Sequence, residues 1–281
     1  MSLHAPLATA VPAPAPPRAA GRVLVGTDGS YWGEAALEWA ARIAWTGGAE
    51  LEVLGTGEAS QYRAPRAFPR LAVTTRRTSE RPLTDVLRSS EDARLLVLGC
   101  RGHRHHGFGL GRLVVPAIAS ARCDTVIVRG RPDAVQGRHG RITAMVDGGP
   151  HDPAVLRGAV EFARLFRAEI EVVHAWPAPS PSTPDIVLDL AAVQLADLDT
   201  RRPFSLRLDT RVPHESVPRI SDSDLIVVGP GTPPGQGGVI TSALHHAACP
   251  VLVAHTDTPD RSPDRPAGRH RAEHCPQQTG R

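Results

Sequence analysis

Two stretches of this 281-residue chain are alike, and their likeness limits the possible folds more than any other feature of the sequence. Residues 22–30 (RVLVGTDGS) and residues 141–149 (RITAMVDGG) are both short apolar runs that end in Asp-Gly. After each run, apolar residues recur at steps of three and four, which predicts an amphipathic helix. An internal repeat of this length indicates one structural unit used twice.

Each copy continues with further apolar runs of four to six residues that are rich in Val, Ile and Leu. These runs lie at residues 50–55, 92–99 and 123–128 in the first copy and at residues 169–176, 224–229 and 249–254 in the second. Such runs are typical of strands buried on both faces of a parallel sheet. Strands that alternate with helices, twice over, predict two tandem α/β domains.

The two expected helices begin with different capping residues. Ser30 precedes the first helix, and Asp152 stands at the start of the second, where Pro153 takes the first helical position. Serine and aspartate side chains accept hydrogen bonds from the free N–H groups of a first helical turn, and proline is tolerated there. We therefore expect both side chains to cap their helices.

The copies differ in length in their middle parts. Asp28 and Gly99 are 71 residues apart, whereas the equivalent separation in the second copy is 82 residues. The additional residues include an amphipathic stretch at 184–199 that predicts a helix. The first copy has residues 57–69 there, which are too few and too interrupted by proline for a full helix.

The repeat and the composition together divide the chain into segments. Residues 21–130 are the expected first domain and residues 140–255 the second, joined by a Gly- and Arg-rich linker at 129–140. Residues 1–20 are rich in Pro and Ala, and residues 256–281 in Pro, Arg and Asp. We expect both ends to be disordered tails.

Composition excludes several classes of function. All 32 basic residues are arginine, which removes Schiff-base chemistry and the lysine of a Walker-type phosphate loop. The net charge of +3 is spread along the chain, so we expect no nucleic-acid partner. No apolar run is long enough to cross a membrane. The four cysteines form no CxxC pair, so the sequence does not support a zinc ribbon or a thioredoxin-like motif. So few cysteines suit reduced thiols in the cytoplasm.

The most unusual segment is the glycine-rich stretch 99–111, GCRGHRHHGFGLG. It follows an expected buried strand and precedes a helical stretch at 115–121, which places it at the carboxyl end of a parallel sheet, where such folds bind ligands. Glycine lets backbone N–H groups approach a phosphate closely. The segment therefore predicts a phosphate-binding loop.

The histidines of this segment suggest a metal site as the alternative. His103, His105 and His106 have a spacing that a loop can gather, with Cys100 or His139 as further ligands. No carboxylate accompanies them, and the glycines on both sides leave the loop without a rigid ligand frame. We expect no metal here.

Two other groups of reactive residues are expected to be structural. The adjacent histidines 245 and 246 end the last expected helix, where cations complement the helix dipole. Cys123 and Cys249 occupy equivalent strand starts and are expected to be small core residues.

Both copies resemble the universal stress protein domain. The resemblance rests on VGTDGS, VLGCRGHRHHGFGLGRLV and ARCDTVIVRG in the first copy and on MVDGGPHDPAVLRGAVEFARLFRAEIEVVHAW, LIVVG and ALHHAACPVLVAH in the second. It implies a doubly wound domain with a five-stranded parallel sheet, present twice, and packing of the two copies as a pseudo-dimer within the chain. Nucleotide-binding members carry G-x2-G-x9-G-[ST] after the fourth strand and hold ATP there.

The first copy matches this motif in part. Gly99 and Gly102 correspond to the first two glycines, and Gly111 to the third with eight intervening residues instead of nine. Arg112 stands where Ser or Thr is expected. The resemblance further places Asp28, Thr56 and Leu113 around the adenosine.

The second copy has a collapsed loop, GPGTPPGQGGV at 229–239, in which Thr232 replaces the second glycine. The resemblance therefore implies ATP as a ligand of the first domain only. Pro116 falls early in the helix after the first loop, where it removes one N–H group.

Three functions are compatible with the sequence. The first is a cytoplasmic stress-response or signalling module that binds an adenine nucleotide and has protein partners not yet identified. The second is a nucleotide-free scaffold in which both sites have decayed, and the third is a slow ATPase. The chain has no GxSxG, HExxH or kinase motif, so we expect no dedicated enzyme and assign no catalytic residue. A homodimer through exposed edge strands is also compatible.

Overall fold

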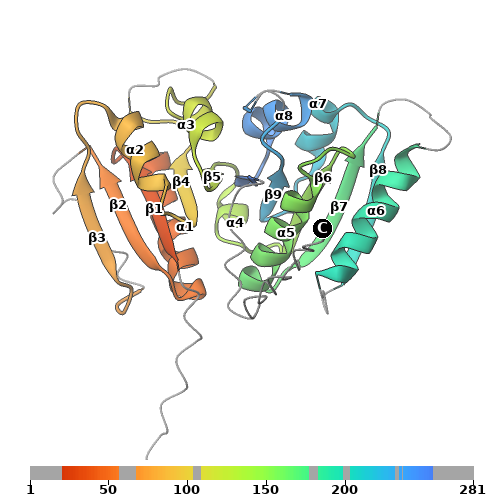
Figure 1. The fold of residues 1–281 in the computed structure, drawn as a ribbon, viewed down its shortest axis with the longest axis horizontal. Coiled ribbons are helices and arrows are strands. Elements are labelled where there is room, and N and C mark those ends of the chain that lie inside the picture. The colour runs from red at the N-terminus through yellow and green to blue at the C-terminus, as the bar shows by residue number, and fades with distance from the viewer. Residues whose placement is uncertain are drawn as a thin grey trace, which may run out of the picture.

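The computed structural model describes residues 21–56, 68–103, 109–176, 183–198, 203–231, 234–235 and 237–255. The expected tails at 1–20 and 256–281 lie outside the described residues. Strands and helices of the described chain alternate, except that the strands at residues 50–55 and 73–77 follow each other directly, and they form the two halves seen side by side in Figure 1.

The described residues of the first half form five strands and three helices. They are β1 (Arg22–Thr27), α1 (Tyr31–Gly47), β2 (Glu50–Gly55), β3 (Val73–Arg77), α2 (Pro82–Ser90), β4 (Leu95–Gly99), α3 (Val114–Ser120) and β5 (Asp124–Val128). The helix expected at 115–121 is α3, which begins and ends one residue earlier. The proline-broken residues 57–67 lie outside the described residues.

The second half follows a short helix, α4 (Pro132–Val135), within the expected linker. Its elements are β6 (Arg141–Val146), α5 (Asp152–Phe166), β7 (Glu169–Ala175), α6 (Thr183–Asp197), β8 (Phe204–Asp209), α7 (Pro213–Ser216), a 3-10 turn (Val217–Arg219), β9 (Leu225–Val228), α8 (Gly238–His246) and β10 (Val251–Val253). The helix predicted at 184–199 is confirmed as α6.

The ten strands that the described residues form belong to one sheet, in the order β3-β2-β1-β4-β5-β10-β9-β6-β7-β8. Within each half the five strands are parallel and in equivalent order, which confirms the predicted doubly wound α/β class. The halves join where β5 pairs antiparallel with β10, with Val126 opposite Leu252. The sequence did not identify β5 and β10 as the strands that join the two halves.

The helices α1 and α5 pack over this junction. The rings of Trp39 in α1 and Phe162 in α5 stack with their centres 5.9 Å apart, and both side chains are fully buried. The guanidinium of Arg42 lies over the ring of Phe166, 5.4 Å from its centre. Aromatic contacts of this kind bury large apolar areas, so they help to hold the two halves together.

The two helix starts differ from each other. The Ser30 hydroxyl accepts a hydrogen bond of 3.1 Å from the N–H of Gly33, which confirms the predicted cap of α1. The prediction for Asp152 was wrong. Its carboxylate turns back and accepts hydrogen bonds from the N–H groups of Asp147 and Gly148, at 3.2 and 2.9 Å. Those groups belong to the turn after β6, and pairing them satisfies donors that the fold would otherwise leave without a partner.

A buried carboxylate fastens the linker to the second half. Asp224, at the start of β9, is fully buried and accepts hydrogen bonds from the N–H groups of His139 and Gly140, at 2.9 and 2.7 Å. The Nδ1 atom of His139 lies 3.0 Å from the same carboxylate. Hydrogen bonds to a charged group are stronger than neutral ones, so this contact fixes where the linker ends.

The last helix ends against the first half. The guanidinium of Arg129 donates to the final carbonyl oxygens of α8, those of Leu244 and His245. Burial, together with His246 and Arg129, lowers the pKa of His245. Arg129 therefore supplies the positive charge at this helix end that the sequence assigned to the histidine pair. Cys123 and Cys249 are buried core residues, as expected.

Candidate functional site

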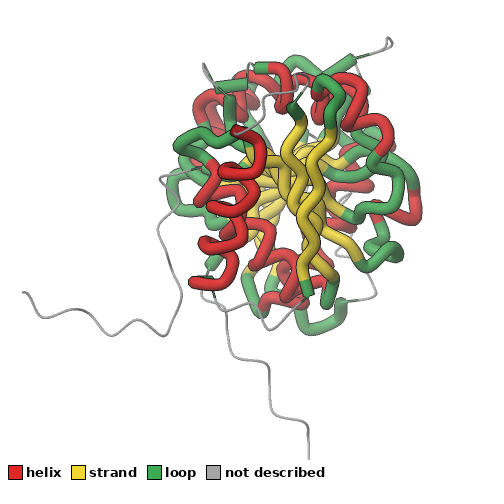
Figure 2. Tube along the Cα trace, turned by 90° about the vertical axis from the view of Figure 1, so that its right-hand side faces the viewer, coloured by secondary structure: helices red, strands yellow, loops and turns green. Residues whose placement is uncertain are grey.

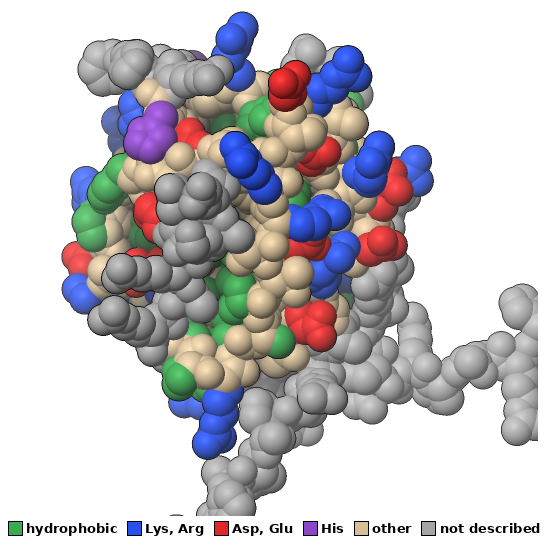
Figure 3. Space-filling model, turned by 90° about the vertical axis from the view of Figure 1, so that its left-hand side faces the viewer, with side chains coloured by type: hydrophobic (Ala, Val, Ile, Leu, Met, Phe, Trp, Pro, Cys, Tyr) green, Lys and Arg blue, Asp and Glu red, His purple; other side chains and the backbone are tan. Residues whose placement is uncertain are grey.

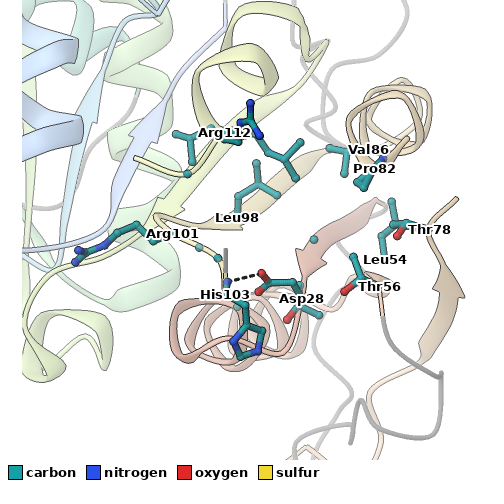
Figure 4. Close-up of a pocket in the computed structure, with 18 of the residues that line it drawn as sticks. Asp28, Leu54, Thr56, Thr78, Pro82, Val86, Leu98, Arg101, His103 and Arg112 are labelled. Carbon is teal, nitrogen blue, oxygen red and sulfur yellow. Dashed lines mark hydrogen bonds between the residues drawn. The ribbon is translucent and has the colours of Figure 1, made fainter. Parts of the chain in front are cut away.

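A cavity of about 820 Å³ opens at the carboxyl ends of β1, β2 and β4. All seven residues predicted from the sequence lie in its wall: Asp28, Thr56, Gly99, Gly102, Gly111, Arg112 and Leu113. They come from three chain segments, which lie at or after the ends of β1, β2 and β4. Figure 4 shows Asp28 and Thr56 on one side of this cavity and Arg112 on the other.

The inner wall is apolar. Leu54 and Leu98 are buried side chains at the ends of β2 and β4, and Val86 of α2 lies beside them. Gly26 of β1 has no side chain, which leaves the space between these residues open. A Cβ atom at this position would lie only 2.7 Å from Cδ2 of Leu98. Sequence reasoning missed this wall.

Asp28 fastens the glycine-rich loop to the end of β1. Its Oδ1 accepts a hydrogen bond of 3.1 Å from the N–H of Ser30, and its Oδ2 accepts one of 2.7 Å from the N–H of His103. Burial acts to raise the pKa of Asp28, but the hydrogen bonds from Ser30 and His103 and the nearby His103 imidazole outweigh it and lower that pKa. The carboxylate is therefore ionised and engaged with the loop at neutral pH.

Glycine is required where the loop passes Asp28. A Cβ atom at Gly102 would lie 2.4 Å from Oδ2 of Asp28, and one at Gly99 would lie 2.5 Å from the carbonyl oxygen of Trp32. The N–H of Gly111 donates to the carbonyl oxygen of Cys100 at 2.8 Å, which brings the two ends of the loop together. Packing therefore favours glycine at Gly99 and Gly102, whereas Gly111 contributes a backbone hydrogen bond that does not depend on its being glycine.

Arg112 follows the loop and is exposed. Among the described residues, Arg112 forms no ion pair. The other arginine of this region, Arg101, points away from the cavity in Figure 4. Pro116 is the third residue of α3, where a missing N–H costs little because the first helical turn has no internal partners for its donors.

The histidine alternative can be followed only in part. His105 and His106 lie outside the described residues. The backbone of His103 is bound to Asp28, His139 contacts Asp224, and burial raises the pKa of the Cys100 thiol. Within the described part of the chain, no three His, Cys, Asp or Glu side chains are close enough to hold a metal ion.

The second half has a much smaller cavity, about 280 Å³, at the equivalent position. Strand register places Met145 where the first half has Gly26, since Gly26 pairs with Leu54 and Met145 with Val173. The Met145 side chain is buried in the core beneath the cavity. A methionine therefore fills the space that the glycine leaves open, and Ala175 replaces the hydroxyl of Thr56.

These features define a doubly wound α/β protein with a ligand-sized cavity at the carboxyl edge of its first half. No protein-family model and no curated protein sequence matches the chain.

Comparison with solved structures gives the fold a name. A universal stress protein from Archaeoglobus fulgidus DSM 4304 is 15% identical, with a TM-score of 0.62 over 83% of this chain and 97% of that one. A candidate universal stress protein from Pseudomonas aeruginosa UCBPP-PA14 is 18% identical, with a TM-score of 0.61 over 84% and 94%. The chain therefore has the universal stress protein fold, as the sequence resemblance implied.

The same fold occurs in a different setting. The cytoplasmic domain of a prokaryotic cation chloride cotransporter is 12% identical, with a TM-score of 0.61 over 86% of this chain and 97% of that one. In the described part of this chain, no helix has the length and apolarity that a membrane span requires. Because one fold can serve unlike functions, the function has to be argued from the site itself.

Proposed function

We propose that the first half of this chain binds one adenine nucleotide, and that the protein acts as a cytoplasmic stress-response or signalling module. The observation that carries this proposal is the single cavity in which all seven predicted residues meet. Its volume of about 820 Å³ falls within the range of about 300–1,000 Å³ that is usual for small-molecule sites.

The chemistry of the wall fits the parts of a nucleotide. The apolar inner surface of Leu54, Val86 and Leu98 suits a flat base, and the Thr56 hydroxyl at the rim can bond to a sugar. The glycine-rich loop can present backbone N–H groups to phosphates. The exposed guanidinium of Arg112 can form two parallel hydrogen bonds to a phosphate, in place of the hydroxyl of the family motif.

We infer a stoichiometry of one nucleotide per chain. The cavity of the second half is about 280 Å³, just below the usual range, because Met145 fills its floor. In the second half, the Asp147 carboxylate accepts a hydrogen bond from the N–H of Gly149, within the same turn. Among the described residues, it forms no hydrogen bond to the loop after β9.

Binding is favoured over catalysis. The Asp28 carboxylate already accepts two backbone hydrogen bonds, and its lowered pKa makes it a weak base. We propose that the nucleotide acts by shifting the population of conformations, since a ligand favours whichever state it binds more tightly. The surface offered to protein partners would change with that shift.

Calorimetric titration of the purified chain with ATP, ADP and AMP tests this proposal. A search for nucleotide released on denaturation should come first, because a retained ligand would mask binding. One site per chain is the expected result. Neither retained nucleotide nor binding at about 1 mM ligand, a free energy weaker than about −4 kcal/mol, would overturn the proposal and favour a nucleotide-free scaffold. Steady phosphate release that Asp28→Ala abolishes would instead identify an ATPase.

A further inference from the structure

The two outer edges of the ten-stranded sheet differ in chemistry. Strand β3 forms one edge and β8 the other. By register, Val73, Thr75 and Arg77 of β3 correspond to Phe204, Leu206 and Leu208 of β8. Figure 3, which faces the β3 side, shows arginine and acidic side chains interspersed over the described surface. Charged and polar residues usually protect a sheet edge from pairing with another chain. On the face that carries Phe204, Leu206 and Leu208, strand β8 lacks such residues.

The apolar residues of β8 are substantially exposed. Phe204, Leu206 and Leu208 keep 37%, 39% and 39% of their surface accessible. Phe204 and Leu206 lie opposite Ile170 and Val172 of β7, which belong to the core beneath α5 and α6. The exposed row is therefore on the face of the sheet that α6 covers. Figure 2 looks at the β8 end of the sheet and shows strands at the front, with helices to either side.

The helix α6 extends this apolar surface. Ile186, Leu190 and Val193 recur at steps of four and three along one side of the helix, and they are 63%, 52% and 59% exposed. The opposite side of α6 packs into the core through Leu188, Ala191 and Leu195. We call the six exposed residues of β8 and α6 the β8 edge surface. Exposed apolar side chains gathered on neighbouring elements in this way are typical of an interaction site.

The backbone hydrogen-bonding groups of β8 also indicate that this edge is a site of interaction. The carbonyl oxygens of Pro203 and Asp209 accept hydrogen bonds from β7 and the residue after it. Because alternate residues of a strand direct their backbone groups to opposite sides, the N–H and C=O groups of residues 204, 206 and 208 face away from β7. No strand in the described part of the chain pairs with them.

We propose that the β8 edge surface binds a second copy of this chain, through antiparallel pairing of the two β8 strands about a twofold axis. Centred on Leu206, this pairing sets Leu206 opposite its own copy and Phe204 opposite Leu208. All the outward-facing backbone groups then find partners in register. The other face sets Ser205 opposite Arg207, so no like charges oppose each other directly. A register centred on Arg207 would bring two arginines together.

The chain already contains a junction of this design. Strands β5 and β10 pair antiparallel, and α1 and α5 meet above them through Trp39 and Phe162. In the proposed dimer, the two copies of α6 would flank the new junction on the same face of the sheet. The β8 edge of a second copy therefore matches this edge in strand direction, side-chain chemistry and symmetry.

Sedimentation velocity of the ligand-free full chain from about 1 to 100 µM tests the proposal, together with Leu206→Lys and the matched variant Thr75→Lys on the opposite edge. We expect a dimer of twice 29.9 kDa. Leu206→Lys should raise its dissociation constant at least about tenfold, because it sets two cations opposite each other, while Thr75→Lys leaves it unchanged. Circular dichroism melting verifies that both variants fold.

Hydrogen exchange of residues 204–208 separates the remaining outcomes. Protection that rises with protein concentration supports the dimer. A monomer at 100 µM overturns the proposal. Slow exchange of residues 204–208 in that monomer would mean that another segment of the chain covers the edge. Fast exchange would mean that the edge is uncovered. A dimer that withstands Leu206→Lys, or that Thr75→Lys weakens equally, also overturns it.

Discussion

The carboxylate of Asp28 accepts a 2.7 Å hydrogen bond from the backbone N–H of His103, so that the end of β1 holds the loop that follows β4. Gly102 makes this approach possible, since a side chain there would overlap the carboxylate. A residue assigned from the family resemblance to the adenosine site thus has a second role, which is to set the position of the glycine-rich loop.

Removal of this tether should weaken nucleotide binding. In Asp28→Ala the loop loses an ionic hydrogen bond, of a type worth about 1.5–3 kcal/mol, so we expect ATP affinity to fall at least about tenfold. Calorimetry measures the change. Asp147→Ala, the equivalent change in the second half, is the matched control and should leave ATP affinity unaltered. Equal losses in both variants would contradict the assignment of the site to the first half.

The same carboxylate predicts a dependence of stability on pH. The pKa of Asp28 in the folded protein lies below its ordinary value of 3.8, so ionisation favours folding. This contribution is complete above the pKa of the unfolded chain and is lost as the pH falls through the folded-state pKa. Between pH 5 and pH 3, the urea midpoint of the natural chain should therefore fall more than that of Asp28→Asn. Parallel curves would show that the tether does not stabilise the fold.

Gly26 and Met145 should account for the difference between the two cavities. We expect Gly26→Met to abolish ATP binding, because it places in the first half the side chain that fills the second. Met145→Ala should leave binding intact and lower the free energy of unfolding by about 2–5 kcal/mol, the usual cost of truncating a buried methionine. Calorimetry and urea unfolding measure the two effects. Undiminished binding by folded Gly26→Met would place the ligand elsewhere.

The linker contact predicts a stability effect without a binding effect. Asp224→Ala leaves the N–H groups of His139 and Gly140 without their buried acceptor, and we expect it to cost about 3 kcal/mol. Asp222→Ala, two residues away, removes only an exposed ion pair with Arg141 and should cost less than about 1 kcal/mol. Urea denaturation compares them. Similar costs would show that burial of Asp224 adds nothing.

Much of this fold could be predicted from periodicity and repetition. The Asp-Gly runs, the Val-rich strands and the Ser30 cap depend on residues close together in the chain, which local patterns record. Strand β3 and helix α2 were missed, because β3 is a polar edge strand of Thr and Arg without a clear alternation. The walls that they supply to the cavity, including Val86, were missed with them.

Other features depend on contacts between distant segments. The pairing of β5 with β10 follows from the way the two halves meet, and neither strand carries a local signal for its partner. Asp152 has the residue type of a helix cap, but the buried N–H groups of Asp147 and Gly148 compete for its carboxylate. The exchange of Gly26 for Met145 is visible in the aligned repeats, yet its importance emerges only once both residues are placed beneath a cavity.

The most direct test of the account is the number of ATP sites on the nucleotide-free chain, measured by calorimetry beside Gly26→Met. We predict one site per chain, with no binding to the Gly26→Met variant. Two sites per chain would contradict the distinction between the halves, and no binding at about 1 mM ATP would contradict the proposed function itself.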